Sequence, residues 1–303
     1  MKDIPGFEKY TKIDFIDIGL SKDKKYYIET TDNKRFILRI SDIAEHDHKK
    51  AAYNRMMHMD NNKIPMSRPT DFGICDGGKS VYQLLTWCDG ENLDNIFTTL
   101  TEAEQYQTGI KAGEVLQKIH SVPVAKADIE ASDWGKRYGS FINASIDSFH
   151  KTGVAIENAD IIFDYFYSNL HLLSSRPQCY MHGDYHTGNL MVTPEGELSV
   201  IDWEIHLYNG YGDPWHEVGL KETPHFSTGF IRGYFGGEPP EDYWRILAFY
   251  ESIGAISSIP WAFYHQPKFL EQCINSVEKV LANFNNMQSH VPMGYLKGYG
   301  GQV

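Results

Sequence analysis

Two stretches, MHGDYHTGNL at residues 181–190 and ELSVIDWE at residues 197–204, decide how the rest of the chain is interpreted. Between them the pattern predicts strands at 190–192 and 198–201, joined by a turn at 194–196. Because an antiparallel hairpin brings its two ends together, Asn189 and Asp202 are expected side by side, near Asp184. A carboxylate can orient the proton of an attacking hydroxyl, and amide and carboxylate oxygens suit Mg²⁺. The segment therefore predicts phosphoryl-transfer chemistry.

Two other interpretations of this histidine-rich segment stay open from the residues alone. It could be a purely structural network of hydrogen bonds. His182 and His186 could also bind zinc, but a lone H-x-x-x-H pair lacks the third ligand that zinc sites normally have.

The pattern His-Gly-Asp-x-x-x-x-Asn followed by Ile-Asp-Trp resembles the aminoglycoside phosphotransferase family, which shares the protein-kinase-like fold with choline and homoserine kinases. The resemblance implies that Asp184 is the catalytic base and that Asn189 and Asp202 hold Mg²⁺ on ATP or GTP. It implies that His182 supports the catalytic loop. Gly212-Asp213-Pro214 matches a further family element, whose aspartate, here Asp213, would brace that loop.

The distribution of expected elements predicts an α+β, bilobal fold. Strands are predicted at 24–30, 35–40, 69–74 and 80–87, with one helix at 42–59, so residues 1–87 are expected to form a small β-rich lobe. Helices are predicted at 101–120, 139–151, 159–173, 241–256 and 268–285, with a capping box formed by Thr101 and Glu104. Residues 88–303 are therefore expected to form a larger, mainly helical lobe with the catalytic loop.

The resemblance also assigns nucleotide-binding residues in the small lobe. Residues 19–27 correspond to the phosphate-covering loop, which includes Ser21, and residues 83–87 to the hinge, with Leu85 and Trp87 beside the purine. Arg39, or else Lys34, stands where the family has a phosphate-binding lysine, and arginine can hold phosphate bidentately.

The acidic partner of that basic residue is harder to assign. Residues 46–59 contain no glutamate, although the family carries one on this helix. Glu45 lies at the helix start, and Asp47 is the other acid there. Either the ion pair is rebuilt differently, or nucleotide binding depends less on it.

Two further motifs are interpreted as coincidental. Residues 73–80 match the P-loop pattern G-x-x-x-x-G-K-S, but a P-loop is followed by a helix, and residues 81–87 are typical of a strand. Asp71-Phe72-Gly73 mimics the kinase magnesium triplet but precedes Asp184 by more than one hundred residues. The corresponding triplet is expected at 202–204.

Composition limits the partners and the location. The net charge of −12 argues against nucleic acid. Residues 1–85 hold 15 Lys+Arg and 13 Asp+Glu, net +2, and residues 86–303 hold 13 and 27, net −14. No apolar run was expected to reach the roughly 18 residues of a membrane helix, and an apolar signal core is lacking. Four scattered cysteines favour reduced thiols, so a cytoplasmic protein without membrane association is expected.

The acidic part of the chain leads to a hypothesis about the acceptor. Acidic and aromatic residues could bind a cationic substrate by ion pairs and cation–π contacts, or they could be solvated acids and core aromatics. The candidates are Glu204, Trp215, Glu217 and Glu251. We therefore expect a kinase that phosphorylates a hydroxyl of an aminoglycoside-like antibiotic or amino sugar. The alternatives are a metabolic kinase for choline, homoserine or a sugar, and a nucleotide-binding pseudokinase.

Overall fold

The computed structural model describes residues 1–18, 21–125, 129, 133–203 and 210–300, and the chain divides into two compact units. The first unit comprises Met1–Thr98 and His182–Leu207, and the second Thr99–Met181 and Tyr208–Val303. The change from predicted strands to predicted helices indicated a single boundary after residue 87. The structure groups the catalytic-loop segment with the first unit because strand β8 (Leu190–Val192) pairs with β6 (Glu91–Asn92).

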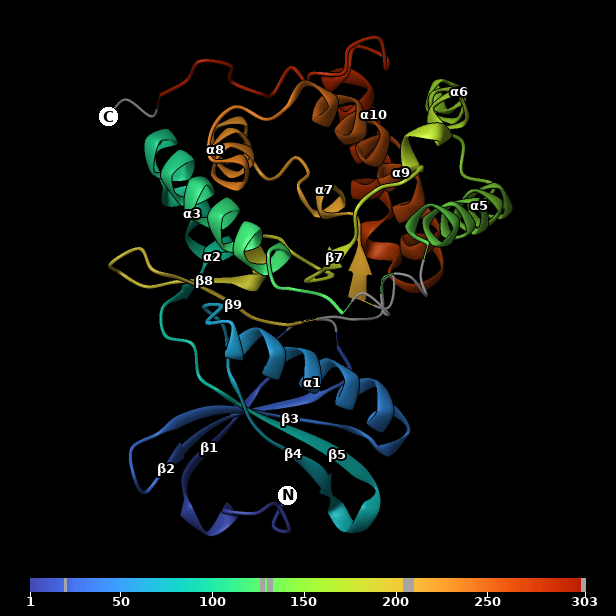
Figure 1. Ribbon diagram of the computed structural model, residues 1–303. Helices are drawn as coiled ribbons and strands as arrows, with labels where there is room; N and C mark the ends of the chain where they lie inside the picture. Colours follow the sequence, from blue (N-terminus) through green and yellow to red (C-terminus); the bar gives the residue numbers. More distant parts are fainter. Residues whose placement is uncertain (19–20, 126–128, 130–132, 204–209, 301–303) are drawn as a thin grey trace. The chain divides into compact units, whose positions relative to one another are not determined.

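A five-stranded antiparallel sheet in the order β1-β2-β3-β5-β4 dominates the first unit (Figure 1). Its strands are β1 (Tyr10–Ile16), β2 (Lys24–Thr30), β3 (Arg35–Asp42), β4 (Pro69–Cys75) and β5 (Ser80–Thr86). The four predicted strands are confirmed. Strand β1 was not predicted because none of its residues is buried, so it lacks the apolar alternation that identifies a strand.

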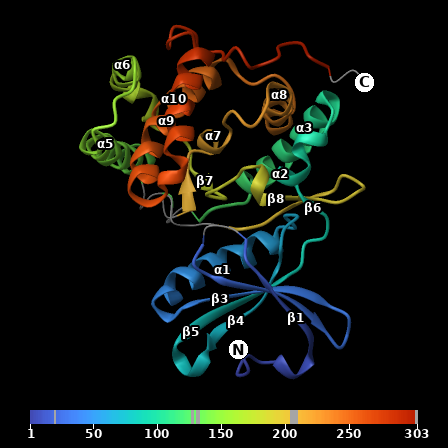
Figure 2. The ribbon, with the colours of Figure 1, turned by 180° about the vertical axis from the view of Figure 1, so that it is seen from behind.

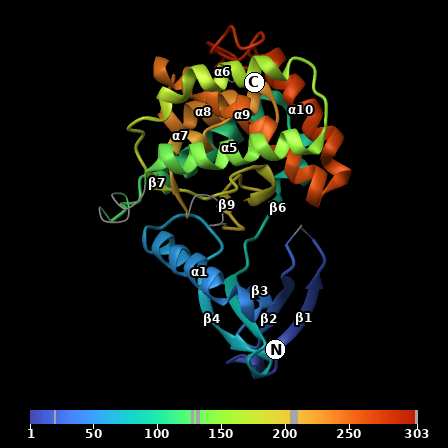
Figure 3. The ribbon, with the colours of Figure 1, turned by 90° about the vertical axis from the view of Figure 1, so that its right-hand side faces the viewer.

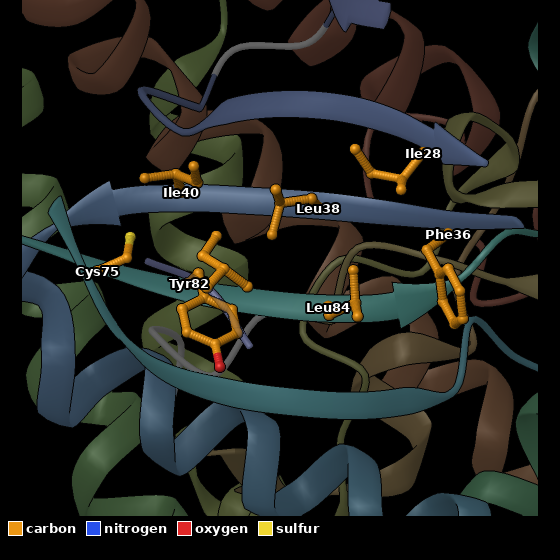
Figure 4. Packing of buried hydrophobic residues seen from close by; sticks show 8 residues of the cluster. Ile28, Phe36, Leu38, Ile40, Cys75, Tyr82 and Leu84 are labelled. Atoms are coloured by element: carbon orange, nitrogen blue, oxygen red, sulfur yellow. The ribbon is translucent and has the colours of Figure 1, made fainter. Parts of the chain in front are cut away.

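The apolar core of this sheet lies on one face (Figure 4). Phe36, Leu38 and Ile40 alternate along β3 and pack with buried residues of the neighbouring strands, namely Ile28, Cys75, Tyr82 and Leu84. Since successive strand residues point to opposite faces, the intervening Ile37 and Arg39 face away from this core. The side-chain period of β3 therefore directs Arg39 toward the other side of the sheet.

Helix α1 (His46–Asn61) follows the short helix η2 (Ile43–Glu45) and contacts β4 and β5. Asp42 caps η2 by accepting a hydrogen bond from the amide of Ala44 at 2.9 Å. The predicted helix at 42–59 is confirmed. Its buried residues include Lys49, which belongs to the same stripe as Ala52 and Met56 at helical spacing.

The first unit is completed by a three-stranded sheet in the order β6-β8-β9, with β9 at Leu198–Val200 and helix α2 at Leu93–Ile96. Figure 2 labels β6, β8 and α2. Met66 forms a parallel bridge with Val200, and the amide of Ser67 donates to the carbonyl of Val200 at 3.1 Å. These bonds attach the hairpin to the segment that leads into β4. The remaining short helices of this unit are η1 (Phe7–Lys9), η3 (Asp76–Gly78) and η6 (Thr187–Asn189).

Helices make up most of the second unit. They are α3 (Glu102–His120), α5 (Trp134–Thr152), α6 (Ala159–Asn169), α7 (Pro214–Glu217), α8 (Pro224–Phe235), α9 (Glu241–His265) and α10 (Leu270–Asn283). Helices α5, α6 and α10 pack around α9 (Figure 3). The shorter elements are η5 (Leu170–Leu173), η8 (Pro267–Phe269), β7 (Cys179–Tyr180) and β10 (Tyr211–Gly212), and η4 (Phe97–Thr99) spans the boundary between the units at Thr98. Thr101 and Glu104 form the predicted capping box, and the α+β class is confirmed.

Helices α3 and α8 lie side by side (Figures 1 and 2). Their contact depends on two glycines in each helix, four residues apart. A Cβ at Gly113 would lie 2.1 Å from the carbonyl oxygen of Phe230, and one at Gly233 would lie 2.1 Å from that of Ile110. Helix α8 was not predicted, because these glycines weaken the local helix signal while permitting the close approach.

Helix α9 corrects one expectation from the sequence. By length and composition it is apolar enough to cross a membrane, although no such run was expected. However, 61% of its apolar window is buried inside the protein. This burial is typical of a central core helix. All four cysteines are free thiols, as expected.

Candidate active site

The β8–β9 hairpin places Asn189 and Asp202 at the same end, as predicted. Leu190 pairs with Val200, and the amide of Ile201 donates to the carbonyl of Asn189 at 3.0 Å. Asn189 therefore takes part in the last hydrogen bond of the hairpin, and Asp202 directly follows its bonding partner Ile201. The Asn189 side chain is buried, whereas 31% of the Asp202 side chain is exposed.

Asp184 is held beside Asn189 by direct hydrogen bonds. The Asn189 amide nitrogen donates to the Asp184 carbonyl at 2.8 Å and to its carboxylate at 3.1 Å. His186 Nε2 lies 3.4 Å from the same carboxylate, whose side chain is 56% exposed. Desolvation alone would raise the pKa of Asp184, but the hydrogen bond and charge of His186 hold it below its usual value. An ionised, accessible carboxylate can accept or orient a hydroxyl proton.

His182 connects the two halves of the site. Its side chain is fully buried, its Nε2 donates to the carbonyl of Ile201 at 3.1 Å, and its Nδ1 accepts from the amide of Asp184 at 3.2 Å. Both bonds are satisfied by a single neutral tautomer with the proton on Nε2. His182 thus ties the backbone of the Asp184 loop to the residue before Asp202.

A cluster of charges surrounds Arg39 on the face of β3 opposite the apolar core. Arg39 Nη1 donates to the carboxylate of Asp202, while its Nε and Nη2 lie 3.0 and 2.8 Å from Asp23 Oδ2. Burial opposes ionisation of Asp202, yet the charge of Arg39 lowers its pKa. Of the two basic residues considered from the sequence, Arg39 therefore lies in the site, whereas Lys34 pairs with Asp32 in the β2–β3 turn.

The partner that the sequence analysis did not identify is Asp23, which directly precedes β2. Lys49 Nζ of α1 lies 2.8 Å from Asp23 Oδ2, and Ser41 donates to Asp23 Oδ1 at 2.7 Å. Burial pushes the pKa of Asp23 upward, but the charges of Arg39 and Lys49 lower it to about 2. Neither Glu45 nor Asp47 takes this part: Glu45 lies 3.7 Å from His48, and Asp47 contacts His46.

The register of the β2–β3 hairpin could have located Asp23. Lys24 pairs with Ile40, so the preceding Asp23 lies opposite Ser41 and diagonal to Arg39. The helical spacing of Lys49 with the buried Ala52 and Met56 could have indicated an inward-facing lysine.

A cavity of about 520 Å³ lies within the first unit beside these charges. Arg39, Asp202, Leu85 and Trp87 line it, together with apolar residues of β1 and β3. This volume is in the range of small-ligand pockets. Ser21 is exposed and accepts a hydrogen bond from the amide of Asp23 at 3.3 Å, and it is absent from the lining. Gly19 and Leu20 of the predicted covering loop lie outside the described residues.

The donor atoms near the hairpin fit Mg²⁺ and not zinc. The bonds of Asn189 described above use its amide nitrogen, which leaves the oxygen, a hard ligand, out of those contacts. Asp202 supplies a carboxylate, and a nucleotide-bound Mg²⁺ needs only one or two protein ligands. Within the described ranges, no group of three histidine, cysteine or acidic residues could hold a metal ion.

The predicted residues of the second unit have different environments. Asp213 is fully buried, accepts two hydrogen bonds from Arg176 at 2.5 and 2.9 Å, and accepts one from Tyr250 at 2.8 Å. It also caps α7 through the amide of Trp215. Its contact with the catalytic loop stays a prediction.

The candidate acceptor residues do not form one group. Trp215 and Glu251 line a common cavity of about 350 Å³. Glu217 is instead buried against His120, with Oε2 2.9 Å from Nε2. Glu204 lies outside the described residues.

The structure confirms that the P-loop match at residues 73–80 is coincidental. Residues 76–78 form the short helix η3, and the residues after Lys79 form strand β5, so no helix follows the glycines. Asp71 accepts a hydrogen bond from Tyr82 at 2.7 Å within the β4–β5 pair. Both motifs are therefore parts of a hairpin.

Comparisons with known proteins identify the family and the fold. The model of the phosphotransferase enzyme family matches residues 12–249. The search of curated proteins found no match.

Solved structures with the same fold include three antibiotic kinases. A GDP and kanamycin complex of APH(2")-IIia has a TM-score of 0.67 at 13% identity, covering 92% of this chain and 96% of that one. A thermostable mutant of aminoglycoside phosphotransferase APH(4)-Ia has a TM-score of 0.62 at 15% identity, covering 91% of this chain and 95% of that one. The amicoumacin kinase hAmiN, in complex with AMP-PNP, Ca²⁺ and Ami, has a TM-score of 0.54 at 13% identity. The match covers 92% of this chain and 90% of that one.

Proposed function

The chain belongs to the phosphotransferase enzyme family and is a small-molecule kinase, and from this premise we propose that it transfers the γ-phosphate of ATP or GTP to a hydroxyl of a cationic acceptor. The acceptor we favour is an aminoglycoside-like antibiotic or amino sugar. One set of observations supports the proposal: Asn189 bonds Asp184, the hairpin puts Asn189 at the same end as Asp202, and Asp202 bonds Arg39, all within a single unit. A pseudokinase would not need an intact set of these groups.

The residues of the site divide the work of an in-line transfer. Asp184, kept ionised, would orient the acceptor hydroxyl and take its proton. His182 would hold the Asp184 loop in register with Asp202. Arg39 would bind phosphate oxygens, and Leu85 and Trp87 would line the purine site. When bound through Asn189 and Asp202, Mg²⁺ would neutralise phosphate charge.

A cationic acceptor is favoured by charge. Residues 86–303 carry 13 Lys+Arg and 27 Asp+Glu, net −14. In the second unit, Glu251 lines the same cavity as Trp215 while one of its oxygens accepts a hydrogen bond from the amide of Leu220 at 2.7 Å, and burial raises the pKa of its carboxyl. A cation that entered this cavity would restore the charged form of Glu251 and could stack on an aromatic ring. We do not assign Glu217 to the acceptor, since His120 already occupies its carboxylate.

The acceptor class is tested by a transfer assay with the purified chain, ATP or GTP, and a panel of hydroxyl compounds. Kanamycin and amicoumacin enter the panel because one structural relative is a kanamycin complex and another is an amicoumacin kinase. Choline, homoserine and simple sugars represent the metabolic alternative. Phosphate transfer to the antibiotics supports the proposal, transfer only to the metabolites overturns its acceptor class, and no transfer to any acceptor favours the pseudokinase. We also propose a cytoplasmic location, for which the free thiols are the support.

The roles of the site residues are tested by two conservative variants. Asp184→Asn is expected to lower kcat by about 10²–10⁴-fold while nucleotide affinity changes little, because it removes the proton acceptor only. Asp202→Asn is expected to weaken Mg²⁺–nucleotide binding instead, measured by calorimetry at varied Mg²⁺. Glu195→Gln, in the exposed turn of the same hairpin, is the control. Full turnover in Asp184→Asn would contradict its assigned role.

A further inference from the structure

Asp23 is a buried carboxylate that binds two basic side chains from two different elements. Its side chain is 6% exposed, and both Arg39 of β3 and Lys49 of α1 lie 2.8 Å from Oδ2. Ser41 holds the other oxygen at 2.7 Å. A buried charge is stable only when it is paired and hydrogen-bonded, and Asp23 meets both conditions.

The charges of this cluster do not cancel. One anion, Asp23, faces two cations, so the three side chains carry a net charge of +1. In the structure Arg39 also bonds Asp202, which neutralises the excess. Lys25 adds a further basic group to the cavity lining, and burial and the charge of Arg39 lower its pKa. A Mg²⁺ ion bound by Asp202 would release the excess charge of Arg39, and a cavity wall with surplus positive charge favours a polyanion.

Helix α1 contributes a basic residue to the buried ion pair, whereas the resemblance implied an acidic one. The buried stripe of α1 presents Lys49 where an acid was expected, and the acid comes instead from Asp23, before β2. We infer that Asp23 is a positioning residue that fixes the guanidinium of Arg39 for nucleotide phosphate, and that Lys49 neutralises Asp23 so that the charge of Arg39 remains available. This inference rests on the proposed function.

The physical reason lies in what each side chain would do alone. Without Asp23, Arg39 and Lys49 would repel one another, and Arg39 would keep only its bond to Asp202, so its guanidinium would be held less firmly. Without Lys49, Asp23 would neutralise Arg39 completely, leaving no surplus for phosphate. Lys49 therefore acts through Asp23 and not by contact with the nucleotide.

The test is calorimetric titration of the full chain with Mg²⁺ and ATP, ADP or adenosine, or the guanine series if the wild type prefers it. Asp23→Asn is expected to weaken ATP binding by about tenfold or more, as for the loss of a charge-assisted hydrogen bond. Adenosine binding should stay within about twofold, because adenosine has no phosphate for Arg39 to bind. Asp17→Asn, an exposed acid on the segment between β1 and β2, is the matched control and should behave as wild type.

A second set of variants separates positioning from support of the fold. Lys49→Met should weaken ATP binding a few-fold, and Asp23→Asn/Lys49→Met should be no weaker than Asp23→Asn alone, since Lys49 acts through Asp23. Lys50→Met, the next and exposed lysine of α1, is the control. Asp23→Glu should recover part of the lost ATP affinity. If Asp23→Asn does not fold, Lys49→Met and Ser41→Ala carry the test, each expected to weaken ATP but not adenosine.

Different outcomes overturn different statements. If Asp23→Asn binds ATP as well as Asp17→Asn does, the inference is wrong and the proposed function stands. Equal losses for ATP and adenosine would likewise overturn it, because Asp23 would then only support the fold. If the wild type binds neither ATP nor GTP, the proposed function itself fails.

Discussion

Asp202 has a left-handed backbone, with φ of 59°. For a residue other than glycine this conformation costs about 1–3 kcal/mol and persists only where its surroundings fix it. Here His182 binds the preceding carbonyl and Arg39 binds the carboxylate. Asparagine tolerates this conformation and alanine does so less well. Asp202→Ala would therefore disturb the backbone as well as remove the charge, which is why the proposed test uses asparagine.

Lys79 provides a prediction that distinguishes the present site from a P-loop. It is exposed in the turn before β5. Lys79→Ala should change kcat and the KM for nucleotide by no more than about twofold. It should change the free energy of unfolding by no more than about 0.5 kcal/mol, as for ordinary surface substitutions. Steady-state kinetics with the best acceptor provide the measurement. A loss of tenfold or more in affinity for nucleotide would revive the P-loop interpretation.

The residues found from the sequence and those missed differ in how far apart they lie along the chain. Asp184, Asn189 and Asp202 lie within one loop and one hairpin, so their spacing was enough to bring them together. Asp23 and Lys49 lie on separate elements and meet only because β2, β3 and α1 pack in one arrangement. Charge pairs of this kind have no local sequence pattern, although strand register and helical spacing reduce the number of residues that could form them.

At the scale of elements, helices α3 and α8 have the closest backbone approach in the second unit, as measured from the Cβ positions that their glycines would have. Gly109 and Gly113 of α3 face Gly229 and Gly233 of α8. Each Cβ would lie between 2.1 and 2.4 Å from a carbonyl oxygen of the other helix. Backbone atoms cannot move aside as a flexible side chain would, so the packing tolerates no larger residue.

Gly113→Ala is therefore expected to destabilise the protein by about 3 kcal/mol, because the new methyl group forces the helices apart. Gly139→Ala in α5 is the matched control, since nothing lies within 4 Å of its would-be Cβ. That change should stabilise the fold by about 0.5–1 kcal/mol through helix propensity. Chemical denaturation measures both variants. Equal stability of the two would show that the helices can adjust freely.

Elements with strong local signals were predicted, and those whose form depends on packing were not. Helix α3 was found because Thr101 and Glu104 mark its start and its apolar face is regular. Helix α9 was predicted to end near residue 256 but continues to His265, through Pro260. Edge strand β1 and glycine-bearing α8 gain their structure from neighbours, which a local pattern does not record.

For the whole molecule, acid stability is expected to depend in part on His216, a partly buried histidine packed against aromatic rings. His216 of α7 packs edge-on against rings from α5 and α9, namely Trp134, Tyr138 and Tyr250. Burial lowers the pKa of His216 to about 4, although the charges of Glu217 and Asp213 favour its protonation and Lys221 opposes it. The folded state therefore holds this imidazole neutral.

Stability should fall as the pH drops from about 6.5 to 4, because there the unfolded chain binds a proton at His216 and the folded chain does not. This single group accounts for at most about 3 kcal/mol. His216→Phe keeps the ring and removes the proton site, so its melting temperature should fall less steeply than that of the wild type. His265→Phe, at the exposed end of α9, is the control. Parallel curves for wild type and His216→Phe would refute the assignment.

The composition and the motif predicted the fold class of the whole molecule, but not how the chain divides into its two compact units. A change from strands to helices near residue 88 is visible in the sequence. The return of the chain to the first unit at residues 182–207 is not, because it depends on strand pairing between β6 and β8, two strands of two and three residues.

That return has a consequence for synthesis on the ribosome. The sheet and α1 can emerge and fold early, but β8, β9 and Asp202 follow only after residues 99–181 have been translated. At about 5–20 residues per second this delay lasts several seconds. During this interval the partner positions of the hairpin on β6 and Met66 are exposed in the nascent chain. The catalytic groups therefore become complete only once the ribosome has made well over half of the polypeptide.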